Sequence, residues 1–175
     1  MDSELEKAIP SSVSEPSRRL YHFPISPASR MARLLLGELK SGVQLQEERY
    51  WSRSEDLLSL NPAGEVPVLR EADGEIYAGA AAVIGYLCDL DEGRTFLPVP
   101  QRPRAEVRRL TEWFTVKFAA EVSTPLIEEK VVKRFLDRAE GGGPPAMPVV
   151  RAALHNLRYH LDYICYLMEH RNWLA

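Results

Sequence analysis

Several features that mark common protein classes are scarce or absent in this 175-residue chain. Cysteine occurs only as Cys88 and Cys165, outside any Cys-x-x-Cys pair, so a disulfide framework is excluded and a reducing cytoplasm is the natural location. The 25 acidic residues outnumber the 22 basic ones, which argues against nucleic acid as a partner because such binders carry a basic excess. No apolar run approaches the roughly 18 residues of a membrane span.

Motifs for metals and phosphates are also missing. His155 and His160 are five residues apart, so they splay around a helix instead of sharing one metal-facing side. The three glycines Gly141–Gly143 lack the Gly-Lys-Ser/Thr that completes a phosphate-binding loop. We therefore expect no metal and no resident cofactor.

What is present predicts a folded core behind a polar tail. Residues 1–17 are rich in serine and acidic side chains and lack the apolar surface that offsets ordering entropy, so they predict a disordered tail. From residue 18 to 91 the patterning predicts the order β-α-β-α-β-β-α. The expected segments are strand 20–23, helix 28–40 stopped by Gly42, strand 43–46, a short helix capped by Ser54, strands 66–69 and 75–77 around Asp73-Gly74, and helix 80–90.

The second half reads as all-helical. Residues 92–103 contain three prolines and predict a linker, and 104–139 predict a helical stretch bent at Pro125. After the break at Gly141–Pro145, apolar residues repeat at steps of four and three, which predicts one stripe on a long helix. These residues are Val150, Leu154, Leu157, Leu161, Ile164 and Met168. This stripe is typical either of a helix packed in a bundle or of a partner-binding face. Because both cysteines lie on apolar helices, we expect them in the core.

Three segments in order resemble the glutathione transferase family. Tyr21–Arg33 resembles its first strand, catalytic loop and first helix; Asn61–Leu69 resembles the signature before its third strand; and Tyr86-Leu87 matches the end of its third helix. The resemblance implies an α+β thioredoxin-like N-terminal domain at 18–91 and an all-α C-terminal domain at 104–175. Because the family's helical domain continues further, the resemblance implies that this domain is truncated, and it implies a homodimer where that domain is complete.

A narrower resemblance is to the FtsZ-localised protein A subgroup, which has the transferase fold and binds filaments of the tubulin-like division protein FtsZ. It is carried by Glu48–Trp51, Asn61–Leu69, Leu126–Phe135, Gly141–Pro145 and Arg158–Tyr163. The resemblance implies a non-catalytic adaptor in bacterial cell division.

The family's catalysis requires a hydroxyl that stabilises the glutathione thiolate. Ser26 occupies that position after the first strand, although a serine beside Pro27 also suits a turn or helix cap. By resemblance, Val66 offers its backbone to an extended ligand and a cis Pro67 exposes that backbone. The family's Glu-Ser pair, which holds the γ-glutamyl carboxylate, is replaced by Gly79 and Ala80. We therefore expect glutathione to be at most a weak ligand.

Two features suit a protein partner. Tyr50 and Trp51 form an aromatic pair in a polar loop, where they are either a lid on the core or interface anchors. Lys130, Lys133, Arg134 and Arg138 cluster within one segment, as a solvated helix face or a docking patch for an acidic partner. Three functions remain open: an adaptor for FtsZ, a serine-type transferase using Ser26, and a truncated remnant without function.

Overall fold

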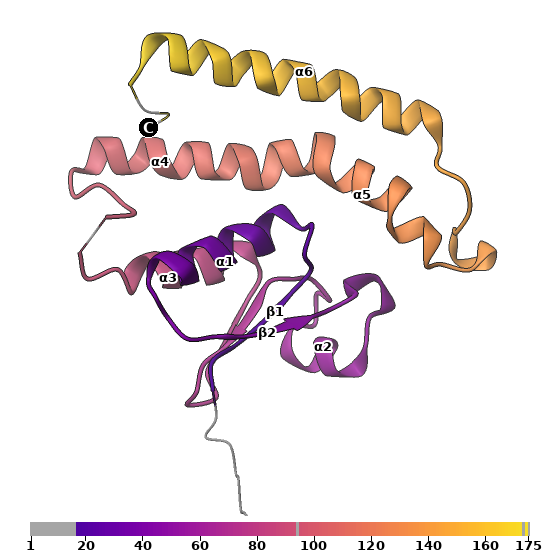
Figure 1. The fold of residues 1–175 in the computed structure, drawn as a ribbon, viewed down its shortest axis with the longest axis horizontal. Helices are drawn as coiled ribbons and strands as arrows, with labels where there is room; N and C mark the ends of the chain where they lie inside the picture. Colours follow the sequence, from indigo (N-terminus) through magenta and orange to yellow (C-terminus); the bar gives the residue numbers. More distant parts are fainter. Residues whose placement is uncertain (1–16, 94, 173, 175) are drawn as a thin grey trace, which may run out of the picture.

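The computed structural model describes residues 17–93, 95–172 and 174 (Figure 1). The predicted tail therefore lies outside the described residues, apart from Ser17. Figure 1 shows a small sheet flanked by helices, with a layer of longer helices above it.

The first half contains a four-stranded mixed sheet. Its strands are β1 (Arg19–His22), β2 (Gln44–Glu47), β3 (Val68–Arg70) and β4 (Ile76–Ala78), in the spatial order β2-β1-β3-β4. β1 runs parallel to β2 and antiparallel to β3, and β3 runs antiparallel to β4. This is the thioredoxin-like arrangement that the family resemblance implies.

Alternation along the strands divides the core between the two faces of this sheet. Leu20 and Leu69 lie on the face covered by α1 (Pro27–Glu38) and α3 (Ala80–Asp89), where they pack with Leu36 and Leu87. Tyr21 and Val68 point to the other face and pack with Leu57 of α2 (Glu55–Leu60). Each such side chain stabilises the fold by about 1.5–3 kcal/mol through removal from water.

The observed boundaries of two helices differ from those predicted from the sequence. Gly42 does not stop α1: the helix ends at Glu38, and Lys40 takes the left-handed backbone conformation with φ 51°. The N–H of Ser41 then bonds to the carbonyl of Leu36, which closes the end of the helix. The first helix of the second half, α4 (Gln101–Glu112), starts three residues before the predicted Arg104, because proline is tolerated in the first helical turn.

The second half is a helical layer. α4 continues through two π-helical segments, Trp113–Lys117 and Ala119–Ser123, into α5 (Thr124–Lys130), and a loop with two 3₁₀ turns leads to α6 (Met147–His170). In Figure 1, α6 runs alongside α4 and α5, on the side away from the sheet. The helical stretch predicted for 104–139 therefore ends at Lys130 as regular helix.

Only part of the apolar stripe predicted on α6 is buried. Val150 is buried, whereas Leu154, Leu161 and Met168 are each about half exposed, at 45%, 48% and 51%. The buried face of α6 also runs through Ala153, His160 and Leu167, because α4 and α5 cover only one side of the helix. Cys165 is exposed and Cys88 is partly exposed, so the prediction that both are core residues was wrong.

Candidate functional site

A cavity of about 400 Å³ lies where the first half meets α5. Its walls come from the loop before α1, the turn after β2, the loop before β3, and α5. It brings together four residues singled out from the sequence: Ser26, Tyr50, Trp51 and Val66. Segments distant in the chain thus converge on one hollow.

Ser26 caps α1 at this cavity. Its Oγ accepts the N–H of Ser29 at 3.3 Å, which satisfies one of the free donors at the start of the helix. The cap uses the hydroxyl as an acceptor, so the hydroxyl proton stays available to a second acceptor. Ser26 is therefore a cap residue, and its geometry also allows donation to a thiolate.

Val66 lies on the opposite wall. The Val66-Pro67 peptide is cis, as the resemblance implies. Within the described chain, neither the N–H nor the C=O of Val66 forms a backbone hydrogen bond, whereas the Pro67 carbonyl accepts the N–H of Gly79 at 3.0 Å. The backbone of Val66 thus has no backbone hydrogen-bond partner among the described residues, and its role in holding a ligand stays a prediction.

Trp51 belongs to an aromatic cluster that joins the two halves. Its ring meets buried Phe23 edge to face at 4.9 Å between centroids, and it stacks on Phe135 at 5.7 Å. Phe135 is 53% exposed, and the guanidinium of Arg49 lies 4.7 Å from its ring centroid. Trp51 is therefore both a lid on the core, through Phe23, and part of an exposed surface, through Phe135.

The charged groups at the cavity do not favour an anion. Arg53 lines it, but so do the carboxylates of Glu65 and Glu128. Burial, with the negative charge of Glu128, raises the pKa of Tyr50. The charges of the cavity wall thus sum to a negative excess, which disfavours a ligand that is itself an anion.

The predicted basic cluster is only partly free. Lys133 donates to both oxygens of Glu129, at 2.8 and 2.7 Å, so its charge is neutralised within the fold. Lys130 and Arg134 are exposed and form no ion pair among the described residues. The surface beside Phe135 therefore keeps a smaller positive charge than the sequence suggests.

Sequence reasoning missed three residues at this site. Phe135, Arg49 and Glu128 reach it from the loop after α5, the turn after β2, and α5 itself. Their segments were singled out only for resemblance to a subgroup. No local pattern marks them, because their proximity depends on how the helical layer docks on the first half.

Comparison with known proteins identifies the family. Residues 20–95 match the family model for the glutathione S-transferase N-terminal domain. The chain is 37% identical over 161 residues to FtsZ-localized protein A from Caulobacter vibrioides, covering 90% of this chain and 69% of that protein. The chain belongs to the glutathione S-transferase family.

Solved structures of this family agree with the fold. A glutathione S-transferase from Sinorhizobium meliloti 1021 superposes with a TM-score of 0.85 and 38% identity, covering 90% of this chain and 70% of that one. FzlA from C. crescentus superposes with a TM-score of 0.82 and 37% identity, with the same coverage. The similarity therefore extends beyond the N-terminal domain into the helical layer.

The positions of the transferase Glu-Ser pair differ in their side-chain chemistry. Gly79 caps α3 with φ 86° and offers no side chain, and Ala80 offers only a methyl group. Ala80 lines a second cavity instead of the one at Ser26. Gly79 lies beside the cis-proline loop, since its N–H bonds to the Pro67 carbonyl at 3.0 Å, but neither position supplies a side-chain ligand for a carboxylate.

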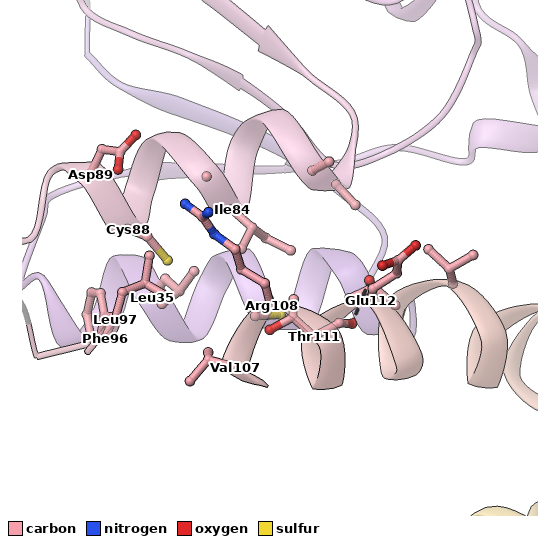
Figure 2. A pocket seen from close by; sticks show the side chains of 16 residues that line it. Leu35, Ile84, Cys88, Asp89, Phe96, Leu97, Val107, Arg108, Thr111 and Glu112 are labelled. Atoms are coloured by element: carbon pink, nitrogen blue, oxygen red, sulfur yellow. Dashed lines mark hydrogen bonds between the residues drawn. The ribbon is translucent and has the colours of Figure 1, made fainter. Parts of the chain in front are cut away.

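That second cavity, of about 630 Å³, lies between α1, α3 and α4 (Figure 2). Its walls are largely apolar, with Leu35, Ile84 and Phe96 among them. Figure 2 shows Arg108 reaching from α4 across the cavity toward α3. Sequence reasoning missed this cavity, because it forms between helices that are far apart in the chain.

The described residues contain neither a membrane-spanning helix nor a cluster of metal ligands. No helix there combines the length and apolar character needed to cross a bilayer. Within the same residues, no three His, Cys, Asp or Glu side chains gather closely enough to hold a metal ion.

Proposed function

We propose that this transferase-fold chain is a cytoplasmic adaptor that binds filaments of FtsZ through the surface around Trp51 and Phe135. The observation that carries the proposal is the exposed aromatic platform, in which half-exposed Phe135 stacks on Trp51 beneath the guanidinium of Arg49. Exposed aromatic and arginine side chains are frequent anchors of protein interfaces. The relative named FtsZ-localized protein A supports FtsZ as the partner.

The transferase features of the cavity support binding over catalysis. Gly79 and Ala80 cannot supply the side-chain hydrogen bonds that hold a γ-glutamyl carboxylate. Losing a hydrogen bond to a charged group costs about 1.5–3 kcal/mol, so affinity for glutathione falls roughly ten- to a hundredfold. The carboxylates of Glu65 and Glu128 lower it further.

The basic residues support a smaller, long-range contribution. Lys130 and Arg134 lie on the segment that leads to Phe135, so they add attraction to an acidic filament. Salt screens exposed charges over about 10 Å at 0.1 M ionic strength. Binding should therefore weaken moderately, but not vanish, as salt rises.

One observation favours a second function, conjugation of glutathione to an electrophile. Ser26 keeps a hydroxyl proton that its cap bond does not use, and it lines the same cavity as Val66. The Ser26 hydroxyl would stabilise a bound thiolate. This activity requires measurable glutathione affinity, which calorimetry tests directly, and affinity tighter than millimolar would favour the enzyme.

The deciding experiment is co-sedimentation of the full chain with polymerised FtsZ. Trp51→Ala should raise the dissociation constant about thirtyfold, which is the loss typical of an interface anchor worth 2 kcal/mol. Phe135→Ala should weaken binding as well, and its exposed position spares the fold. The matched control is Tyr166→Ala, an exposed aromatic on α6 that should bind like the parent.

Ser26→Ala separates the two functions. For an adaptor this variant sediments like the parent, with folding checked by circular dichroism. If Trp51→Ala and Phe135→Ala both bind normally while Ser26→Ala abolishes a measurable conjugation rate, the enzyme replaces the adaptor. If the parent chain neither binds filaments nor conjugates glutathione, both the adaptor and the transferase function are refuted. The remaining possibility is then a truncated remnant without function.

A further inference from the structure

The cavity between the first half and α5 has a wall that is both acidic and aromatic. Glu65 and Glu128 contribute two carboxylates to it, against the single guanidinium of Arg53. Among the described residues none of these three side chains forms an ion pair, so the fold does not use their charges to hold itself together. The wall therefore offers a net negative charge to whatever enters the cavity.

One of the carboxylates lies beside the aromatic rings. Burial, followed by the negative charge of Glu128, raises the pKa of Tyr50, which places that carboxylate near the phenol. The rings of Tyr50 and Trp51 meet edge to face, with 5.1 Å between their centroids and 80° between their planes. A cation within about 6 Å of a ring face is attracted by its π electrons, and a carboxylate beside the ring adds to that attraction.

The neighbouring surface already contains a pair of this kind. The guanidinium of Arg49 lies 4.7 Å from the ring centroid of Phe135, and Phe135 stacks on Trp51. In the part of the chain that the structure describes, no lysine or arginine lies over the ring of Tyr50 or Trp51. These two rings, which line the cavity, are therefore available to a cation from outside the chain.

Arg53 opposes a bound cation but does not cancel the acidic wall. Its backbone has a φ of 47°, and its guanidinium lies beside Gly64. Two carboxylates against one guanidinium leave an excess of one negative charge. Removal of the Arg53 charge should therefore strengthen the binding of a cation and weaken the binding of an anion, so this residue distinguishes the two kinds of ligand.

The size of the cavity and its hydrogen-bond acceptors suit a basic side chain. Its volume of about 400 Å³ can hold one long side chain but no folded element. Ammonium and guanidinium groups only donate hydrogen bonds, so they require acceptors around them. The carboxylates of Glu65 and Glu128 are such acceptors, and the carbonyl of Val66 accepts no backbone hydrogen bond among the described residues.

We propose that this cavity binds a lysine or arginine side chain of the filament, held by the carboxylates of Glu65 and Glu128 and by the rings of Tyr50 and Trp51. The proposal rests on the proposed function for its partner, and it adds the chemistry that the cavity recognises. The charge preference is the opposite of that of a site for an anionic ligand. The contact with the filament then includes one basic side chain inside the cavity, next to the aromatic platform.

The first test uses a small cation in place of the filament. The probe is acetyl-argininamide, and its matched control is acetyl-citrullinamide, which has nearly the same shape and no charge. In a nuclear magnetic resonance titration of the full chain, the indole N–H signal of Trp51 should shift saturably with a dissociation constant in the millimolar range. The signal of Trp113, whose indole N–H is bonded to His160, should stay in place. The neutral control should bind at least about tenfold more weakly.

Variants of the wall test which charges act. Glu65→Gln and Glu128→Gln should each weaken the binding of acetyl-argininamide at least about threefold, and Arg53→Gln should strengthen it about two- to threefold. Glu75→Gln makes the same charge change at an exposed residue outside the cavity wall, and it should bind the probe like the parent. The proposal is overturned if the probe does not bind, if both probes bind equally, or if Arg53→Gln weakens binding.

Co-sedimentation separates this proposal from the proposed function. Glu128→Gln should raise the dissociation constant for FtsZ filaments at least about threefold, with folding checked by circular dichroism. If the parent and Glu128→Gln bind filaments equally, the adaptor function stands and the cavity takes no basic side chain from the filament. If the parent does not bind filaments, the adaptor function fails and the filament is not the source of the cation. The titration with acetyl-argininamide then still decides whether the cavity is a cation site.

Discussion

The two halves of this chain are stabilised by different means. In residues 19–89, apolar side chains cover both faces of a sheet, and both clusters of fully buried apolar residues lie there. The helical layer has fewer such residues, and it leaves large apolar side chains such as Val116 and Leu161 exposed. The first half therefore has the denser apolar core, and the second half leaves more apolar surface exposed among the described residues.

Polar contacts join the elements of the helical layer. Nδ1 of buried His160 on α6 accepts a hydrogen bond from the indole N–H of Trp113 at 3.1 Å. The ring proton therefore lies on Nε2, which donates to the carboxylate of Glu121 at 3.0 Å. Glu106 on α4 accepts from Arg171 at 2.7 Å, beyond the end of α6. Hydrogen bonds from Arg109 and Arg171 lower the pKa of Glu106 to about 2.

This contrast between apolar packing in the first half and polar contacts in the helical layer indicates what fixes the arrangement of the helices. Hydrogen bonds between named partners fix which helix lies beside which, although each adds only about 1 kcal/mol of net stability. Apolar burial in the first half supplies most of the free energy. Mutations should therefore destabilise the first half through lost packing, and should loosen the second half through lost polar partners.

The largest effect should come from the apolar core. Leu69 is fully buried between the sheet and α1, so Leu69→Ala should lower the free energy of unfolding by about 2–5 kcal/mol. The matched variant Leu154→Ala removes the same atoms from an exposed site on α6 and should change it by less than about 0.5 kcal/mol. Urea denaturation measures the free energy of unfolding of both variants. Equal losses would mean that the two halves do not differ in packing.

A smaller, pH-dependent effect should come from Glu129, which is buried between α5 and the start of α6. Its carboxylate binds Lys133 and accepts the N–H of Ala146 at 2.6 Å. The hydrogen bond from Lys133, followed by that from Ala146, lowers the pKa of Glu129 below its ordinary value. The ionised group therefore stabilises the fold above its unfolded pKa, and that contribution is lost as pH falls through the lowered folded pKa.

Glu129→Gln should accordingly lower the melting temperature at pH 7, and the gap to the parent should close as pH falls below about 4. Glu128→Gln is the control, because Glu128 is exposed and forms no such pair among the described residues. Melting curves followed by circular dichroism across this pH range make the comparison. If the difference in melting temperature between the parent and Glu129→Gln stays constant with pH, the ionised Glu129 does not link α5 to α6.

Local patterns in the sequence were enough to predict the helices and strands of the first half. Alternation in the strands, the cap at Ser54 and the Asp73-Gly74 turn predict elements that the structure contains, since each depends on neighbouring residues. The resemblance also located Ser26 and Val66, which do line one cavity. The contribution of Phe135 was not predictable, because it depends on the docking of distant segments.

The helical layer shows where periodicity fails. The steps of four and three along α6 correctly predict a helix, but they do not reveal that its buried face is rotated so that Leu154 and Leu161 stay exposed. The rotation places polar His160 in the interior, where Trp113 and Glu121 satisfy it. A pattern based on apolar residues alone assigns His160 to the surface, since it cannot anticipate distant hydrogen-bond partners.

The smallest expected effect lies in the first half and concerns Lys40. Lys40 holds φ 51° after α1, a conformation that costs a residue with a side chain about 1–2 kcal/mol and costs glycine much less. Because glycine also loses more entropy on folding, Lys40→Gly should raise the free energy of unfolding by only about 0.5–1 kcal/mol. Lys40→Ala is the matched control, since it removes the charge and keeps the strain, and it should bring no gain. Urea denaturation of both variants decides the point: a gain from alanine equal to that from glycine would assign the effect to the lysine side chain instead of its backbone.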